Sequence, residues 1–166
     1  LLNDLEDSNI QFCEEPIARW NFMRLGEVRK KSPIPVMADE SCCDHHDAKR
    51  LIDLKACDMF NIKLGKSGGV FDALRIIRLA EKAGIKLQVG AFMESRLGMT
   101  AFAHLALCSK NIRYCDFDTP LMFVEDPVSG GIRYGGNGTV TVPEEPGLGA
   151  SIGAAYLDKL EKKTFQ

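Results

Sequence analysis

Charged side chains stand at the ends of short apolar runs in this 166-residue chain. Glu14 ends the first run, Asp39 the second and Lys63 the third, while Asp116 ends the last and Asp118 follows it. A charge at the end of a buried strand needs a partner, because burying an unpaired charge is costly. Two carboxylates and an amine brought together could hold a divalent cation and move a proton beside it.

The residue types indicate which cation the site could hold and which residue could transfer the proton. Glu14 and Asp39 offer hard oxygen ligands of the kind that Mg²⁺ prefers, and because two carboxylates are few for a metal site, we expect a third ligand upstream of Leu1. Lys63 can act as a base only if its pKa is lowered, which partial burial and a nearby cation would do. Lys66 is the competing lysine, but it lies beyond the strand end. Each residue alone could instead form an ion pair or cap a helix.

The elements that must position these residues repeat along the chain. Five apolar runs are predicted to be strands, and their ends lie about 25 residues apart. They are Ile10–Glu14, Val36–Asp39, Met59–Lys63, Leu87–Gly90 and Arg113–Asp116. Helical patterns lie between them, at Trp20–Lys31, Ala48–Leu54, Gly69–Gly84 and Leu97–Leu107.

A strand–helix repeat of this period predicts an α/β fold with a parallel sheet, because parallel strands need a crossover connection. Eight such units close a barrel in about 250 residues, and this chain shows only five strands. The first residues, Leu1–Ser8, read as the end of a helix already under way. We therefore expect a barrel fragment whose first strands lie upstream.

The C-terminal part has a different pattern, so we predict βα units over residues 1–122 and a tail over 123–166. Within the tail, Ile132–Tyr134 and Thr139–Val142 flank a glycine-rich turn and predict a β-hairpin. A final short helix is predicted over Ala154–Lys163. This tail is expected to pack back on the barrel or on a capping domain.

Composition excludes several classes of function. Lys and Arg number 21 against 23 Asp and Glu, which gives a net charge of -2 and no dense basic patch. Nucleic acid and membrane are therefore not expected partners. The six cysteines form no Cys-x-x-Cys pair, and Asp44 in the Cys/His-rich stretch 42–47 is better explained as a helix N-cap than as a zinc ligand. We expect a cytoplasmic protein with reduced thiols.

At this point the sequence resembles the C-terminal half of the enolase superfamily, in the muconate lactonizing subgroup, and most closely the dipeptide epimerases such as the L-Ala-D/L-Glu epimerases. The motifs that carry the resemblance run along nearly the whole chain. They are Phe12-Cys13-Glu14-Glu15-Pro16, Ala38-Asp39-Glu40-Ser41, Asn61-Ile62-Lys63-Leu64-Gly65-Lys66-Ser67-Gly68-Gly69, Met93-Glu94-Ser95 and Asp116-Phe117-Asp118.

The resemblance implies a fold, a cofactor and a reaction. The fold would be the C-terminal part of a (β/α)7β barrel, with the N-terminal capping domain and first strands outside this chain. Glu14 and Asp39 would be two of three Mg²⁺ ligands, and Lys63 one of two facing acid/base lysines. Enolase-superfamily sites combine such a base with Mg²⁺ that stabilises an enolate-type intermediate. The implied reaction inverts the α-carbon of a dipeptide by proton transfer, and only the complete chain would be active.

The remaining roles follow from the same motifs. Asp116 and Asp118 would bind the ammonium group of the dipeptide, and Met93 would contact its side chain. Glu15, Glu40 and Asn61 would support the metal ligands and the lysine. The resemblance also implies a homo-oligomer, with Ala-Glu as the default substrate.

Two alternatives stay open. Another member of the subgroup, such as an o-succinylbenzoate synthase, an N-acylamino acid racemase or a muconate cycloisomerase, would act on substrates without a free ammonium group. A non-catalytic homologue that only binds a ligand is the alternative from a different class.

Overall fold

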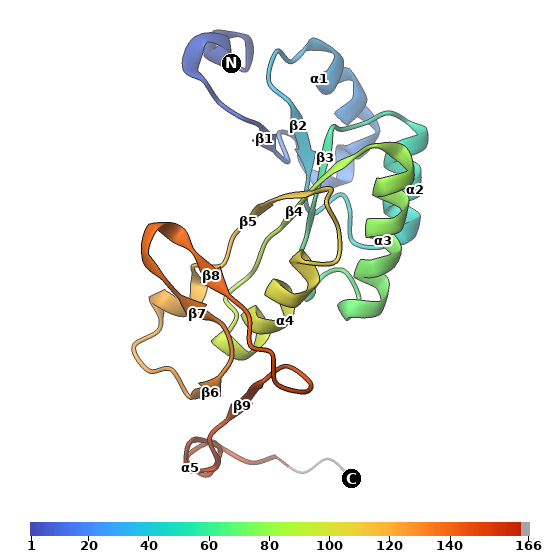
Figure 1. The fold of residues 1–166 in the computed structure, drawn as a ribbon. Coiled ribbons are helices and arrows are strands. Elements are labelled where there is room, and N and C mark those ends of the chain that lie inside the picture. Colours follow the sequence, from blue (N-terminus) through green and yellow to red (C-terminus); the bar gives the residue numbers. More distant parts are fainter. Residues whose placement is uncertain (164–166) are drawn as a thin grey trace. The chain divides into compact units, whose positions relative to one another are not determined.

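The computed structural model describes residues 1–163 (Figure 1). The chain forms two compact units: the first comprises Leu1–Ala91 with Leu105–Asp116, and the second Phe92–His104 with the chain from Phe117 on. The domain boundary expected between residues 122 and 123 stays a prediction. Of the expected tail, residues 164–166 lie outside the described residues.

A five-stranded parallel sheet forms the centre of the first unit. Its strands lie side by side in chain order: β1 (Cys13–Glu14), β2 (Val36–Ala38), β3 (Met59–Ile62), β4 (Lys86–Val89) and β5 (Ile112–Cys115). The predicted parallel α/β fold is confirmed. The strand predicted from Ile10 is shorter, because the neighbouring chain at 32–35 contains Pro33 and Pro35, which have no N–H to continue the ladder.

The sheet curls. Phe12, next to β1, and Tyr114 of β5 stand at opposite edges, yet their ring centroids are 5.0 Å apart in an edge-to-face contact. Strands four places apart in a flat sheet would be separated by about 19 Å. The contact therefore requires a curved sheet, as in part of a barrel.

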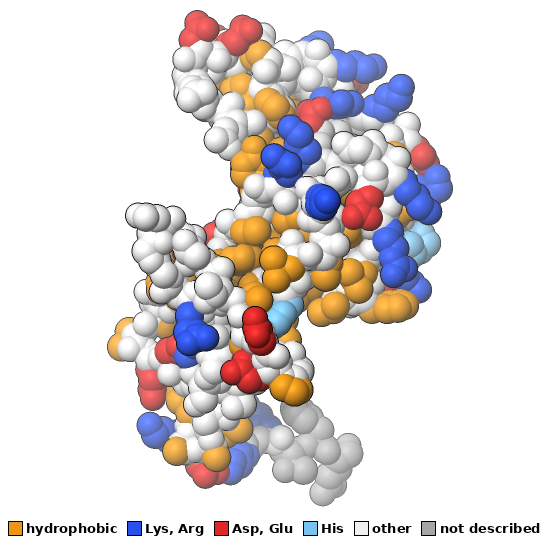
Figure 2. All heavy atoms as spheres, in the orientation of Figure 1, with side chains coloured by type: hydrophobic (Ala, Val, Ile, Leu, Met, Phe, Trp, Pro, Cys, Tyr) orange, Lys and Arg blue, Asp and Glu red, His pale blue; other side chains and the backbone are white. Residues whose placement is uncertain are grey.

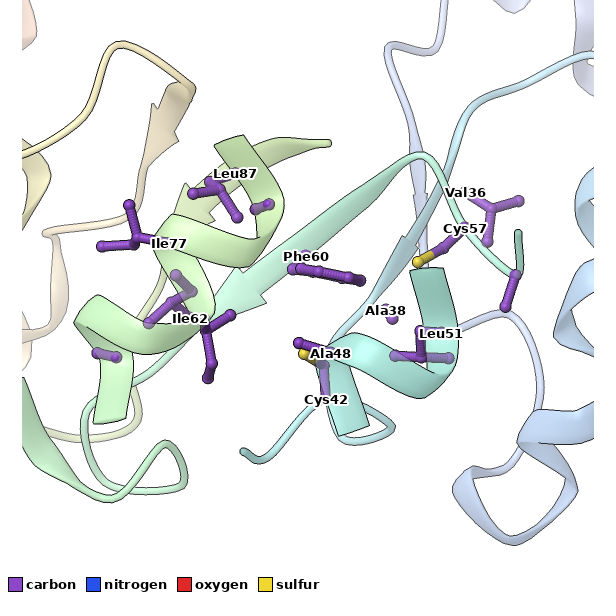
Figure 3. Close-up of a cluster of buried hydrophobic side chains, with 14 of the residues drawn as sticks. Val36, Ala38, Cys42, Ala48, Leu51, Cys57, Phe60, Ile62, Ile77 and Leu87 are labelled. Carbon is purple, nitrogen blue, oxygen red and sulfur yellow. The ribbon is translucent and has the colours of Figure 1, made fainter. Parts of the chain in front are cut away.

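Three helices follow the first three strands, as the sequence predicts: α1 (Leu25–Lys31), α2 (His45–Asp53) and α3 (Gly69–Ala83). Helices α2 and α3 pack side by side along the sheet (Figure 1). Figure 3 shows Phe60, which is fully buried, lying between side chains of these helices and their neighbouring strands. The buried cluster around it includes Val36, Ala38, Cys42, Ala48, Leu51, Cys57, Ile62, Ala73, Ile76, Ile77, Ala80 and Leu87.

Helix ends follow local sequence rules with two departures. The helix predicted from Trp20 begins as a 3-10 segment, η2 (Arg19–Arg24), because Asn21 leaves helical geometry. Residues of the opening stretch form another 3-10 segment, η1 (Asn3–Ser8), rather than an α-helix. Gly84 ends α3 with φ 70°, a conformation that favours glycine.

The helix α4 (Arg96–Ala106) agrees with the predicted Leu97–Leu107 to within one residue at each end. Beyond it, the predicted hairpin is confirmed by the antiparallel strands β7 (Arg133–Tyr134) and β8 (Val140–Thr141), joined through η4 (Gly136–Gly138). The segment η3 (Thr119–Met122) was not predicted from the sequence, and neither was the antiparallel pair of β6 (Val128–Gly130) with β9 (Ala150–Ile152).

The predicted final helix is wrong in length. Helix α5 covers only Ala154–Leu157, one turn, and residues 158–163 do not continue it. The charged sequence Glu161-Lys162-Lys163 is exposed, so no buried apolar stripe supports further turns.

The surface agrees with the mixed composition. On the face drawn in Figure 2, basic side chains over the helices of the first unit are interspersed with acidic and neutral ones. Among residues 1–163, no helix has the length and apolarity needed to span a membrane.

The N-cap of α2 generates a stability prediction. The Asp44 carboxylate accepts a hydrogen bond of 2.8 Å from the Asp47 backbone N–H, and this bond holds the pKa of Asp44 below its ordinary 3.8. We expect Asp44→Ala to remove about 1 kcal/mol of stability at neutral pH. A lowered folded pKa stabilises above the unfolded value and is lost as pH falls through the folded value. The difference from wild type should therefore shrink below pH 3.8.

Thermal unfolding of the complete polypeptide, followed by circular dichroism over this pH range, measures the effect. Asp53→Ala, at the other end of the same helix, is the control, because an acid in the last turn does not cap the N-terminus. Equal destabilisation by both substitutions would contradict the capping role.

Candidate active site

The alternation of side chains along the strands separates the candidate site from the core. The core residues of β2 and β3 pack toward the helices. The residues that alternate with these core residues, including the residue directly after each strand, therefore face the other side of the sheet. Asp39 and Lys63 follow the last residues of these two strands, with Asn61 two residues before Lys63. Three predicted site residues therefore share one face of the curled sheet.

Asp39 and Lys63 form a largely buried ion pair. The Lys63 Nζ donates to Asp39 Oδ2 over 2.6 Å, and the two side chains are 12% and 5% exposed. Burial by itself would raise the pKa of Asp39, but the hydrogen bond from Lys63 and the charges of Lys66 and Lys63 outweigh it and hold the pKa below its usual value. Asp39 is therefore kept ionised.

The ion pair corrects one expectation. Burial is the largest influence on the Lys63 pKa and lowers it, but the bond to Asp39 and the charges of Asp39, Glu14 and Glu40 together raise it above its ordinary value. The expected lowering is therefore not produced by the side chains of this chain. Carboxylates surround the amine, and their negative charge favours its protonated form.

Glu14 reaches the same site from β1. Asn61 Nδ2 donates to Glu14 Oε1 over 2.7 Å, across the intervening strand β2. Partial burial raises the pKa of Glu14, and the nearby Asp39 carboxylate raises it further, although Asn61 and Lys63 act in the opposite direction. A carboxylate whose charge is disfavoured by burial and by a neighbouring carboxylate is one that a bound cation would stabilise.

Glu15 connects the ends of β1 and β2. Its carboxylate accepts hydrogen bonds from the backbone N–H of Asp39 at 2.7 Å and of Ser41 at 3.3 Å, and from the Ser41 hydroxyl. Glu15 has φ 41°, which is unfavourable for a residue with a side chain. The three accepted bonds offset this strain and fix the backbone that carries Asp39.

Lys66, the second lysine, is held by contacts that were not predicted from the sequence. Lys66 Nζ donates to the backbone carbonyls of Cys42 and Asn61, both at 2.7 Å, and lies 3.4 Å from Asp39 Oδ1. The two carbonyls take two of its three N–H donors, Asp39 interacts with it through charge, and its side chain is 8% exposed. The geometry favours Lys63 over Lys66 as the proton-transfer group.

The comparison with known proteins decides the family. The model of the enolase C-terminal domain-like family matches residues 1–156. The chain belongs to this family. The predicted resemblance is confirmed, and the five parallel strands are those of a partial enolase-type barrel.

Two relatives that are similar to this chain are named epimerases. The D-Ala-D/L-Ala epimerase of Cytophaga hutchinsonii is 58% identical over 158 residues, which cover 95% of this chain and 43% of that protein. The L-Ala-D/L-Glu epimerase of Bacillus subtilis is 39% identical over 94% of this chain and 43% of its own length. This chain therefore spans less than half of the curated relatives that it matches.

A solved structure of a similar protein has the same fold. It is described as a dipeptide epimerase from Cytophaga hutchinsonii complexed with Mg and the dipeptide D-Ala-L-Val. Its TM-score is 0.95 and its identity 57%, with 96% of this chain and 44% of that chain covered. The muconate lactonizing enzyme from Pseudomonas putida, at 32% identity over 93% of this chain and 43% of its own length, has a TM-score of 0.88.

The carboxylates at the ends of β1 and β2 fit a hard divalent cation. Glu14 and Asp39 supply carboxylate oxygens from neighbouring strands, and Asp39 Oδ1 is buried without a hydrogen-bond donor among the described residues. Within residues 1–163, no group of three or more His, Cys, Asp or Glu side chains could hold a metal ion. The expectation of a further ligand upstream stays a prediction.

Other predicted site residues are exposed or belong to the second unit. Glu40 is exposed and acts on Lys63 through its charge. Met93 is 65% exposed and lies in the second unit. Asp116 ends the first unit, whereas Asp118 lies in the second, and both are exposed. The pairing of the two aspartates around one ligand therefore stays a prediction.

We predict that Glu15 supports metal binding through Asp39. Glu15→Ala removes all three accepted bonds, and support of this kind is typically worth about 10–100-fold in metal affinity. Glu15→Gln keeps an acceptor for the two backbone N–H groups and should weaken Mg²⁺ binding far less. Titration calorimetry of the complete polypeptide with Mg²⁺ measures both, and equal losses in the two variants would contradict this role.

Proposed function

We propose that the polypeptide containing this chain is a Mg²⁺-dependent dipeptide epimerase that inverts an α-carbon by proton transfer. The observation that carries the proposal is the buried Asp39–Lys63 pair beside Glu14, in a chain whose similar relatives are named epimerases. In this proposal Lys63 is one acid/base group, and a second lysine facing it is supplied upstream.

Lys63 suits transfer of a proton at one face of the substrate. Its amine is at the end of β3, held against Asp39 and partly open to solvent at 12% exposure. For one epimer Lys63 Nζ would take the α-proton, and for the other epimer it would deliver one. An opposed lysine would perform the complementary transfer on the other face, so the configuration inverts.

Glu14 and Asp39 would hold the Mg²⁺ ion. When bound, the cation supplies positive charge that offsets the negative charge developing on the substrate carboxylate. Within this chain, Asn61 orients Glu14, while Glu15 and Lys66 fix the segment that carries Asp39. These contacts preorganise the carboxylates, so less rearrangement is needed on binding.

Asp116 and Asp118 would recognise the free ammonium group of a dipeptide. A cation between two carboxylates satisfies both charges and forms charge-assisted hydrogen bonds. Tyr134, whose hydroxyl donates to the Phe117 carbonyl over 2.6 Å, fixes the backbone next to Asp118. Recognition of ammonium favours dipeptides over the substrates of the other subgroup members.

Small apolar dipeptides are further candidate substrates. Ala-Glu is the default substrate that the resemblance implies, while the relative at 58% identity is named a D-Ala-D/L-Ala epimerase. The exposed Met93 offers an apolar contact for a side chain. We therefore propose alanine-containing dipeptides, with Ala-Ala and Ala-Glu as the first two to compare.

An N-acylamino acid racemase is the second candidate. One relative at 33% identity is named an N-succinyl-L-Arg/Lys racemase of Bacillus cereus. Its named substrate class has an acylated amine, which the two aspartates would not favour. Homo-oligomer formation and a cytoplasmic location stay predictions.

We expect Lys63→Ala in the complete polypeptide to slow epimerisation by at least about 10²-fold, because a positioned acid/base group typically contributes 10²–10⁴-fold. Mg²⁺ binding should persist, since Glu14 and Asp39 stay in place. Proton NMR of dipeptides in D₂O follows the loss of the α-proton signal and the appearance of the other epimer. Lys49→Ala, an exposed lysine of α2, is the matched control. Unchanged activity in Lys63→Ala would refute the assignment.

Asp118→Asn tests recognition of the ammonium group. A hydrogen bond to a charged group contributes about 1.5–3 kcal/mol, so we expect KM for free dipeptides to rise about tenfold or more, with a smaller change in kcat. Glu144→Gln, also exposed in the second unit, controls for loss of one negative charge. Equal use of N-acetylated and free dipeptides by the wild type would assign the aspartates another role and favour the racemase.

A further inference from the structure

Gly90 follows β4 and is buried beside Asn61. A Cβ atom added at residue 90 would lie 2.5 Å from Asn61 Oδ1, 2.7 Å from Nδ2 and 3.0 Å from Cγ. Non-bonded heavy atoms normally approach to about 3.5–4.0 Å. The Asn61 amide therefore occupies the space that any side chain at residue 90 would need.

Backbone conformation does not explain the glycine. Gly90 is absent from the residues with positive φ, so its backbone is compatible with alanine. Its N–H donates to the Ile62 carbonyl over 2.9 Å, which continues the ladder from β4 to β3. The constraint at this position is steric, and it comes from one side chain.

The Asn61 amide is placed at a cost. The side chain is 2% exposed, and its Oδ1 has no hydrogen-bond partner among the described residues. A buried polar atom without a partner is unfavourable, because it has lost its hydrogen bonds to water. The orientation that leaves Oδ1 unsatisfied is the one in which Nδ2 donates to Glu14 Oε1.

We infer that Gly90 is a positioning residue for the metal site: the absence of its side chain lets Asn61 hold Glu14 in the orientation that binds the cation. This inference rests on the proposed function, because it takes Glu14 as a Mg²⁺ ligand. The chain of contacts runs from β4 through β3 to β1, and its three members are Gly90, Asn61 and Glu14.

The test is a double-mutant cycle on the complete polypeptide. Gly90→Ala should displace the Asn61 amide and weaken Mg²⁺ binding about 10–100-fold, and Asn61→Ala should do the same. In the double variant the added methyl group meets no amide, so the affinity should equal that of Asn61→Ala alone. Titration calorimetry with MgCl₂, without substrate, gives the dissociation constants.

Gly26→Ala is the matched control. Outside its own helix, the nearest atom to a Cβ added at Gly26 would be the Leu54 carbonyl oxygen at 3.5 Å, so Mg²⁺ affinity should not change. If Gly90→Ala fails to fold, the double variant decides: recovery of folding when Asn61 is also removed supports the steric link. Failure of both variants to fold would place the clash elsewhere and overturn the inference.

The outcomes separate this inference from the proposed function. If the wild-type protein binds no Mg²⁺, both this inference and the proposed function are overturned. Wild type that binds Mg²⁺, together with a Gly90→Ala variant of equal affinity, overturns only the role of Gly90. Multiplied losses in the double variant would also overturn it, because they would show that the two residues act independently.

Discussion

The buried carboxylate of Asp39 is the constraint around which the first unit is arranged. A carboxylate that is almost fully buried is stable only when cations and donors compensate for the lost water. Lys63 and Lys66 supply the two cations, from the chain directly after β3. Glu15 fixes the Asp39 backbone from β1. One buried charge thus couples the ends of three neighbouring strands.

The parallel sheet makes this coupling possible. All its strands end on the same side, so residues that are about 25 positions apart become neighbours. The two-residue alternation assigns apolar side chains such as Phe60 to the helices and Asn61 to the opposite face. Curvature of the sheet, seen in the Phe12–Tyr114 contact, lets Asn61 reach Glu14 across β2. The fold and the site therefore depend on the same geometry.

The sequence predicts those parts that follow from local or periodic rules. The five strands, the helices between them, the N-cap at Asp44 and the hairpin around Gly136 all have signals within a few residues. The pairing of β6 with β9 has no such signal, because it joins short segments about 20 residues apart. The single turn of α5 ends earlier than its helix-forming residues suggest, because no buried stripe supports it.

The same distinction holds in the site. Positions at strand ends identify Glu14, Asp39 and Lys63, but contacts across strands depend on curvature and register, which no single segment encodes. Ser41 therefore could not be predicted as a partner of Glu15, nor Lys66 as a donor to two carbonyls. The pKa of Lys63 depends on burial and on three surrounding carboxylates together, and this balance across neighbouring strands cannot be derived from residue type alone.

The division of the chain into two units bears on how such a protein changes specificity. The groups proposed for proton transfer and metal binding lie at the ends of the parallel strands, whereas Met93 and Asp118, proposed to contact the substrate, belong to the second unit. A substitution at Met93 alters an exposed side chain and disturbs no core packing. A substitution at Asn61 or Gly90 alters buried contacts on which Glu14 depends. Under the proposed function, selectivity could therefore change while the acid/base groups stay in place, which is how barrels with variable loops support several substrates.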